Sequence, residues 1–250
     1  MNGTEIFYTL ASVVLVSLFS LVGIVLLLLK ERILSYVVIL LVSFSSGSLF
    51  GDAFIHLLPE TVAEHGFTVA VSIFVLCGIA GAFVVEKIIH WRHVHYPEQA
   101  EVEAFAYMNL LGDAVHNLLD GVVIAAAYAV DIRVGIATTI AILFHEIPQE
   151  MGDFGVLIHG GVSRKRALLF NFVTALTALA GAVVTIFLIN FVNQVIVFLI
   201  PFSAGTFIYI AGSDLIPQLH KEKAVRNSLL QLLFFSLGIA IMVFLRLEMG

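Results

Sequence analysis

Eight apolar segments of about 20 residues, the length that crosses a bilayer core as a helix, follow one another along this chain. Of its 250 residues 60% are hydrophobic and only 12% are charged, whereas a soluble domain carries roughly 25% charged residues. Such a chain cannot cover itself with polar surface. We therefore expect an all-α integral membrane protein in which residues 1–250 form one domain in the lipid bilayer. We place its spans near residues 6–29, 34–58, 67–89, 104–130, 132–158, 166–189, 192–217 and 228–247.

Charge and cysteine content exclude two classes of partner. The formal net charge is −6, and no basic face is present to meet the phosphates of a nucleic acid. The single cysteine, Cys77, permits neither an intrachain disulfide nor a thiolate metal cluster. We therefore expect no nucleic-acid partner and no cysteine-based metal site.

The basic residues predict how the chain is oriented. Ten of the twelve Lys and Arg residues follow the first, third, fifth or seventh span, and only Arg133 and Arg246 fall on the other side. Short cytoplasmic loops carry such an excess of positive charge. We therefore expect an even number of spans with both termini on the extracytoplasmic side, and the plasma membrane as the location.

An internal repeat relates the second and seventh spans. Residues 44–60 (FSSGSLFGDAFIHLLPE) align without a gap with residues 202–218 (FSAGTFIYIAGSDLIPQ), and Pro59 meets Pro217. These spans run in opposite directions in the predicted topology, which is the pattern of inverted repeats in transporters. We expect spans 1–3 and 6–8 to be related in this way around a central pair, spans 4 and 5. Chance similarity between apolar segments is the alternative.

Acids, amides and histidines are concentrated in two stripes, one in span 4 and one in span 5. Steps of three and four residues place each stripe on one helix face. The stripes contain Asn109, Asp113, His116, Asn117 and Asp120 in span 4, and His145, Glu146, Gln149, Glu150 and Asp153 in span 5. A charged side chain at mid-membrane costs about 2.5–3.5 kcal/mol, and neither span holds an internal Lys or Arg. Protons or a bound cation must compensate, unless the stripes form only a structural polar interface.

The types of side chain in these stripes favour a transition metal. Histidine beside carboxylate and amide oxygens suits a borderline metal better than magnesium or calcium. Pro148 lies inside the second stripe, where we expect it to free the carbonyl of Phe144 and to bend the helix. Spans 1, 3, 6 and 8 carry almost no charge, and we expect them to face lipid.

Further candidates lie outside the two stripes. In the repeat, Asp52 and Asp214 either line the cation path or cap packing contacts. The segment HWRHVH is expected in the longest cytoplasmic loop, where its histidines either collect metal or help to anchor the segment at the interface. These histidines are His90, His93 and His95.

HNLLDG (116–121), followed by HEIPQE (145–150), resembles the paired motifs of the ZIP (Zrt/Irt-like) family of metal transporters. HLLPE (56–60) and GDF (152–154) extend the resemblance, which is nearest to the branch whose fifth helix reads HEXPHE. The resemblance implies transport towards the cytoplasm, commonly by a homodimer, with spans 1, 4, 5 and 6 sliding against the others. It implies no enzyme and no catalytic residue. The metal would be zinc in the first place, with iron, manganese or cadmium as the other candidates.

The resemblance also implies a site for one or two metal ions in mid-membrane. A first position would use His116, Asp120, His145 and Glu146, with His56 reaching in from span 2. A second position would use Asn117, Asp120, Glu146 and Gln149. Gln149 stands where the family motif has its second histidine, so the second position is expected to be weak. The cation-path candidates beyond these would be Asp52, Asp113, Glu150, Asp153 and Asp214.

Two other functions compete with a carrier. A metal-selective channel would use the same stripes, although the inverted repeat favours alternating access. An intramembrane zinc protease would need a second histidine four residues after His145, where Gln149 stands instead. In such a protease an LDG tripeptide also follows the HE pair along the chain. Here LDG (119–121) comes before His145 and Glu146.

Overall fold

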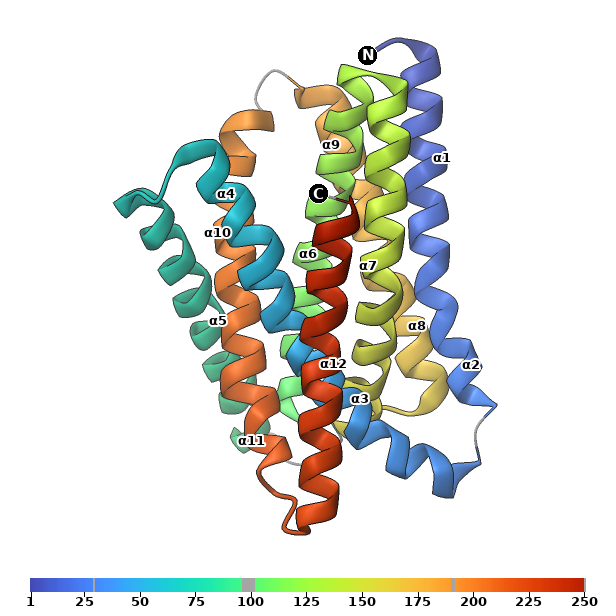
Figure 1. The fold of residues 1–250 in the computed structure, drawn as a ribbon, viewed down its shortest axis with the longest axis vertical. Helices are drawn as coiled ribbons and strands as arrows, with labels where there is room; N and C mark the ends of the chain where they lie inside the picture. The colour runs from blue at the N-terminus through green and yellow to red at the C-terminus, as the bar shows by residue number, and fades with distance from the viewer. Residues whose placement is uncertain (29, 96–101, 190–191, 250) are drawn as a thin grey trace.

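The computed structural model describes residues 1–28, 30–95, 102–189 and 192–249, which form a bundle of long helices (Figure 1). The α-helices are α1 (Gly3–Phe19), α2 (Ile24–Leu27), α3 (Glu31–Gly51), α4 (Leu58–His65), α5 (Val69–His95), α6 (Ala104–Val130), α7 (Ile132–His159), α8 (Arg164–Ala175), α9 (Thr177–Leu188), α10 (Val192–Tyr209), α11 (Ile216–Leu219) and α12 (Val225–Met249). A 3-10 segment, η1 (Ser20–Gly23), joins α1 to α2, and two π-helical segments are η2 (Asp52–Leu57) and η4 (Ile210–Leu215).

The all-helical membrane architecture expected from the sequence is confirmed. In the described ranges, 7 helical segments are long and apolar enough to cross a bilayer. The 28-residue helix α7 is a further long helix, and it carries the acids of the second stripe. Both termini lie towards the upper end of the bundle in Figure 1.

Two predicted spans are longer than expected. The second runs on past residue 58 to His65, through the π-helical segment η2, and Pro59 stands in the first turn of α4 directly after that segment. Helix α5 likewise continues beyond the predicted end of the third span to His95, so the backbone of the HWRHVH segment is helical. No glycine or proline interrupts residues 82–95. The side chains of this segment lie outside the described part.

The spans differ in how deeply they are buried, as their charge content predicted. The first, third, sixth and eighth spans have 39, 17, 33 and 22% of their most apolar window buried, against 78, 61 and 61% for the second, fourth and seventh. Large apolar side chains such as Phe7 and Phe187 are exposed on the weakly buried helices. These faces suit contact with lipid, and the polar helices form the interior.

The two π-helical segments occupy equivalent places in the two aligned sequence segments, residues 44–60 and 202–218. In the alignment of residues 44–60 with 202–218, η2 falls directly opposite η4. Each π turn adds a residue to the helical turn and redirects the side chains that follow, a feature that is frequent at functional sites. In η2 the redirected residues include Asp52 and His56.

Glycines allow close contact between the helices that carry the repeat. A Cβ on Gly47 of α3 would lie 2.0 Å from the carbonyl oxygen of Phe235 in α12. At the aligned position in α10, a Cβ on Gly205 would lie 2.1 Å from the carbonyl oxygen of Val75 in α5. Only glycine permits backbones to approach so closely. The same contact therefore joins α3 to α12 and α10 to α5.

Candidate metal site

The two polar stripes of α6 and α7 face the interior of the bundle. Nine of their ten residues are buried, each with at most 6% of its surface exposed, and His145 is half-buried. The two helices pack directly against each other, so the stripes meet. Each stripe therefore lies on one helix face, as expected, and that face is directed into the bundle.

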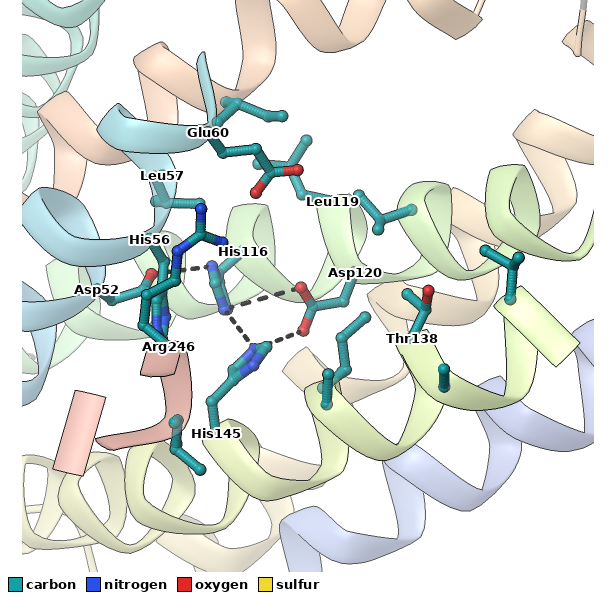
Figure 2. Close-up of a pocket in the computed structure, with 17 residues that line it drawn as sticks. Asp52, His56, Leu57, Glu60, His116, Leu119, Asp120, Thr138, His145 and Arg246 are labelled. Carbon is teal, nitrogen blue, oxygen red and sulfur yellow. Dashed lines mark hydrogen bonds and ion pairs between the residues drawn. The ribbon is translucent and has the colours of Figure 1, made fainter. Parts of the chain in front are cut away.

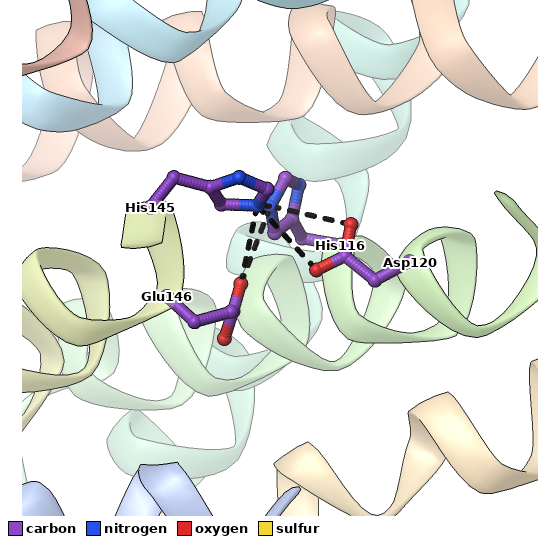
Figure 3. Close-up of side chains that lie close together, drawn as sticks. All are labelled: His116, Asp120, His145 and Glu146. Atoms are coloured by element: carbon purple, nitrogen blue, oxygen red, sulfur yellow. Dashed lines mark hydrogen bonds and ion pairs between the residues drawn. The ribbon is translucent and has the colours of Figure 1, made fainter. Parts of the chain in front are cut away.

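Four side chains from the two stripes converge on one point (Figure 3). Each of His116, Asp120, His145 and Glu146 offers one ligand atom, and these atoms all lie within 4.8 Å of one another. The two histidines approach through their Nε2 atoms, which are 3.4 Å apart. His116 and Asp120 are four residues apart on one face of α6, and His145 and Glu146 are consecutive in α7 where it packs against α6.

Several distances in this group are close to those of a tetrahedral metal site, and the ligand atoms together spread over no more than 4.8 Å. With bonds of about 2.0–2.1 Å, the ligand atoms of tetrahedral zinc lie about 3.4 Å apart. Glu146 Oε1 lies 3.5 Å from Nε2 of His116, and Asp120 Oδ2 lies 3.5 Å from Nε2 of His145. The four groups can therefore bind one ion with little rearrangement, and two carboxylates would balance a divalent charge.

Asp52 and His56 of η2 stand beside this group rather than within it. The Nδ1 atom of His56 donates to Asp52 Oδ1 at 3.0 Å, and the ring of His56 lies 6.3 Å from that of His145. The other oxygen of Asp52 lies 3.8 Å from Nδ1 of His116, on the side of that ring away from the four ligand atoms. Asp52 thus lies behind His116 without a hydrogen bond to it, and His56 lies next to the group.

A cavity of about 450 Å³ reaches the four-residue group from one end of the bundle (Figure 2). Its wall includes Asp52, His56, His116, Asp120 and His145. Further lining residues come from the first turns of α7 and from the last turns of α12, the ends predicted to be extracytoplasmic. An ion entering from that side would meet the carboxylates and histidines in succession.

The stripe residues on the other side of the group are shut off from this cavity. Asp113, Glu150 and Asp153 are buried, and none of them lines it. Asn109 donates to Asp153 at 2.9 Å, and both carboxylate oxygens of Glu150 lack a hydrogen-bond partner in the described part of the structure. The candidate path is therefore open on one side of the group and closed on the other.

Three more predicted site residues lie outside the group of four ligands. Asn117 is fully buried, and its side-chain amide nitrogen donates to the Asp113 carboxylate at 2.8 Å. Its side-chain oxygen has no hydrogen-bond partner in the described part of the structure. Gln149 is buried beside Glu150, with its amide nitrogen also unpartnered among the described residues. Asp214 is buried in η4 outside the cavity wall, and its charge interacts with that of Glu86.

Sequence reasoning missed two charged lining residues, Glu60 and Arg246 (Figure 2). Glu60 stands four residues after His56 and belongs to the HLLPE motif, so helical spacing could have identified it. Arg246 comes from the far end of the chain, in α12. Nothing in its local sequence connects it to residues so distant along the chain.

Comparison with known proteins identifies similar sequences. A family profile described as "ZIP Zinc transporter" matches residues 92–246. The chain is 34% identical over 220 residues to zinc transporter ZIP13 of Pongo abelii, covering 81% of this chain and 65% of that protein. It is 30% identical to zinc transporter zipt-7.2 of Caenorhabditis elegans, covering 81% of this chain and 56% of the relative. It is also 31% identical to zinc transporter YKE4 of Saccharomyces cerevisiae, covering 81% and 69%. The chain thus spans less than two thirds of the length of the first two relatives.

Proposed function

Because the chain belongs to the ZIP zinc transporter family, we propose that it carries divalent transition-metal ions, zinc foremost, across the membrane towards the cytoplasm. The observation that carries this proposal is the four-residue group of α6 and α7. Two histidine nitrogens and two carboxylates lie at tetrahedral spacing in the interior of a membrane protein. In this role His116, Asp120, His145 and Glu146 are the ligands of the ion in transit, and iron, manganese and cadmium are further candidates.

The transport mechanism in this proposal is alternating access. A carrier opens its site to one side at a time. The cavity reaches the ligand group from the predicted outer side, and Asp113, Glu150 and Asp153 beyond the group are buried. The aligned π segments and the matching glycine contacts of α3 and α10 support an inverted repeat of spans 1–3 and 6–8 around α6 and α7. A continuous pore at the same site would instead favour a channel.

The remaining roles belong to the same proposal. His56 receives the incoming ion next to the ligand group, and Asp113, Glu150, Asp153 and Asp214 serve the exit. Asn117 and Gln149, sharing Asp120 and Glu146, hold a second, weaker ion. His90, His93 and His95 collect metal at the cytoplasmic end of α5.

Residues 1–250 act as one domain, as a homodimer in the plasma membrane with both termini outside. Chemical cross-linking in lipid nanodiscs, read by mass, tests the dimer, and a uniformly monomeric protein would contradict it.

Metal uptake by sealed vesicles containing the purified protein tests the proposed activity. Zinc, iron, manganese, cadmium and magnesium are offered in turn, and the initial rate is followed with an internal fluorescent indicator. We expect uptake that saturates with transition-metal concentration and no uptake of magnesium. His116→Ala and Glu146→Ala should each nearly abolish it, because each removes a ligand from a four-ligand site. Wild-type rates in both variants would refute the assignment, and rates that never saturate would favour a channel.

A further inference from the structure

Arg246 is the single lysine or arginine in the described wall of the outer cavity. Figure 2 shows its side chain reaching into the cavity on the same side as Glu60 and His56. It is partly buried, and its charge acts on the carboxylate of Glu60. In the described part of the structure it forms no ion pair at 4.0 Å or closer. A permanently charged cation therefore projects into a cavity whose other charged or titratable lining residues are carboxylates and histidines.

A fixed positive charge in a path for cations needs a physical reason. Three carboxylates line this cavity, on Asp52, Glu60 and Asp120. Without a metal ion their negative charges repel one another in a space that is only partly open to water. A guanidinium stays protonated at any physiological pH and can compensate several carboxylates without binding tightly to one. It also repels a divalent ion that approaches the same acids.

We propose that Arg246 is a tethered counter-cation, which balances the acids of the cavity while it is empty and which the incoming metal ion displaces. This inference rests on the proposed function for its transport readout. Arg246 would then set the metal concentration at which the carrier is half saturated. It stabilises the empty, outward-open protein and competes with weakly held ions. It would not be a ligand of the transported ion.

Substitution of Arg246 tests the proposal through metal affinity. In Arg246→Gln the apparent KM for uptake should fall by roughly threefold to tenfold, because a repelling charge near a divalent ion is gone. Arg246→Lys keeps the charge and should remain near wild type. The matched control is Arg133→Gln, which removes the other basic residue of the outer side. Arg133 is exposed at the start of α7 and does not line the cavity, so its KM should not change.

A second readout separates charge compensation from a purely structural role. The metal-free Arg246→Gln protein should melt at a lower temperature than wild type, and excess zinc should remove the difference. If the glutamine variant fails to fold, Arg246→Met, which keeps much of the length of the side chain, replaces it. A KM for the folded variant that equals or exceeds the wild-type value would overturn the proposal.

The failure of this inference can be told apart from that of the proposed transport. Zinc binding to the purified protein in detergent, measured by calorimetry, needs no transport. If the wild-type protein binds zinc but moves none, the proposed function fails while binding to Arg246→Gln still decides the role of the arginine. Tighter binding than wild type supports the counter-cation, and equal or weaker binding refutes it.

Discussion

Asp52→Asn should weaken metal binding although Asp52 is not among the four ligands. Its Oδ1 accepts a hydrogen bond from His56 at 3.0 Å, and its Oδ2 lies 3.8 Å from Nδ1 of His116. His116 turns its other nitrogen, Nε2, to the ligand group. A carboxylate behind a metal-binding histidine fixes the ring and its tautomer and makes the ligating nitrogen more basic. A small decrease in the 3.8 Å distance between Asp52 Oδ2 and His116 Nδ1 on metal binding would form the hydrogen bond of this arrangement.

The size of the effect follows from this outer contact. Loss of such a supporting carboxylate lowers metal affinity about 10- to 100-fold, which is about 1.4–2.8 kcal/mol. We expect the upper half of that range, because the substitution also removes one negative charge from the cavity. Asparagine has nearly the same shape, and the site is only 1% exposed, so the packing should survive.

Calorimetric titration of the purified protein with zinc measures this change directly, and the KM for vesicle uptake should rise in parallel. Asp131→Asn is the control, since Asp131 is an exposed acid at the start of α7. It accepts from the backbone N–H of Arg133 at 2.7 Å, a capping bond that asparagine also forms. Wild-type zinc affinity in the folded Asp52→Asn protein would show that the contact does not support His116.

Three further outcomes are expected. Gln149→His should strengthen the second metal position and slow release, and anomalous diffraction at the metal edge should then show two strong peaks between α6 and α7 where the wild type shows one; two equal peaks in the wild type would contradict this. The orientation is tested by cysteine labelling in a variant that lacks Cys77. A cysteine at position 64 should react with an impermeant thiol reagent in intact cells, whereas one at position 223 should not. The reverse labelling would overturn the predicted orientation. Gly121→Ala should lower the free energy of unfolding by about 1–3 kcal/mol. The new Cβ would lie 1.8 Å from the carbonyl oxygen of Ala178, so α6 and α9 would have to move apart. An unchanged denaturation midpoint in detergent would contradict this packing.

The sequence predicted most of the fold because the relevant signals are local. A run of apolar residues reports a membrane span whatever surrounds it, and helical spacing places polar residues on one face. α6 and α7 coincide with the predicted spans to within a residue. The ends of the second and third spans were less accurate, since a proline in the first turn of α4 and a polar extension of α5 remain helical.

The membership of the two stripes was likewise determined by the sequence alone, as was the need for protons or a bound cation to compensate the acids. The family resemblance implied that His116, Asp120, His145 and Glu146 form one site, and the tertiary structure brings these four side chains together. The rotation and crossing of α6 and α7 select four of the ten stripe residues for the tetrahedral group. The π turn of η2 turns Asp52 towards His116, and the packing of α12 brings Arg246 to the same cavity. Such contacts depend on the relative positions of helices distant along the chain, and periodicity within one helix carries no information about them.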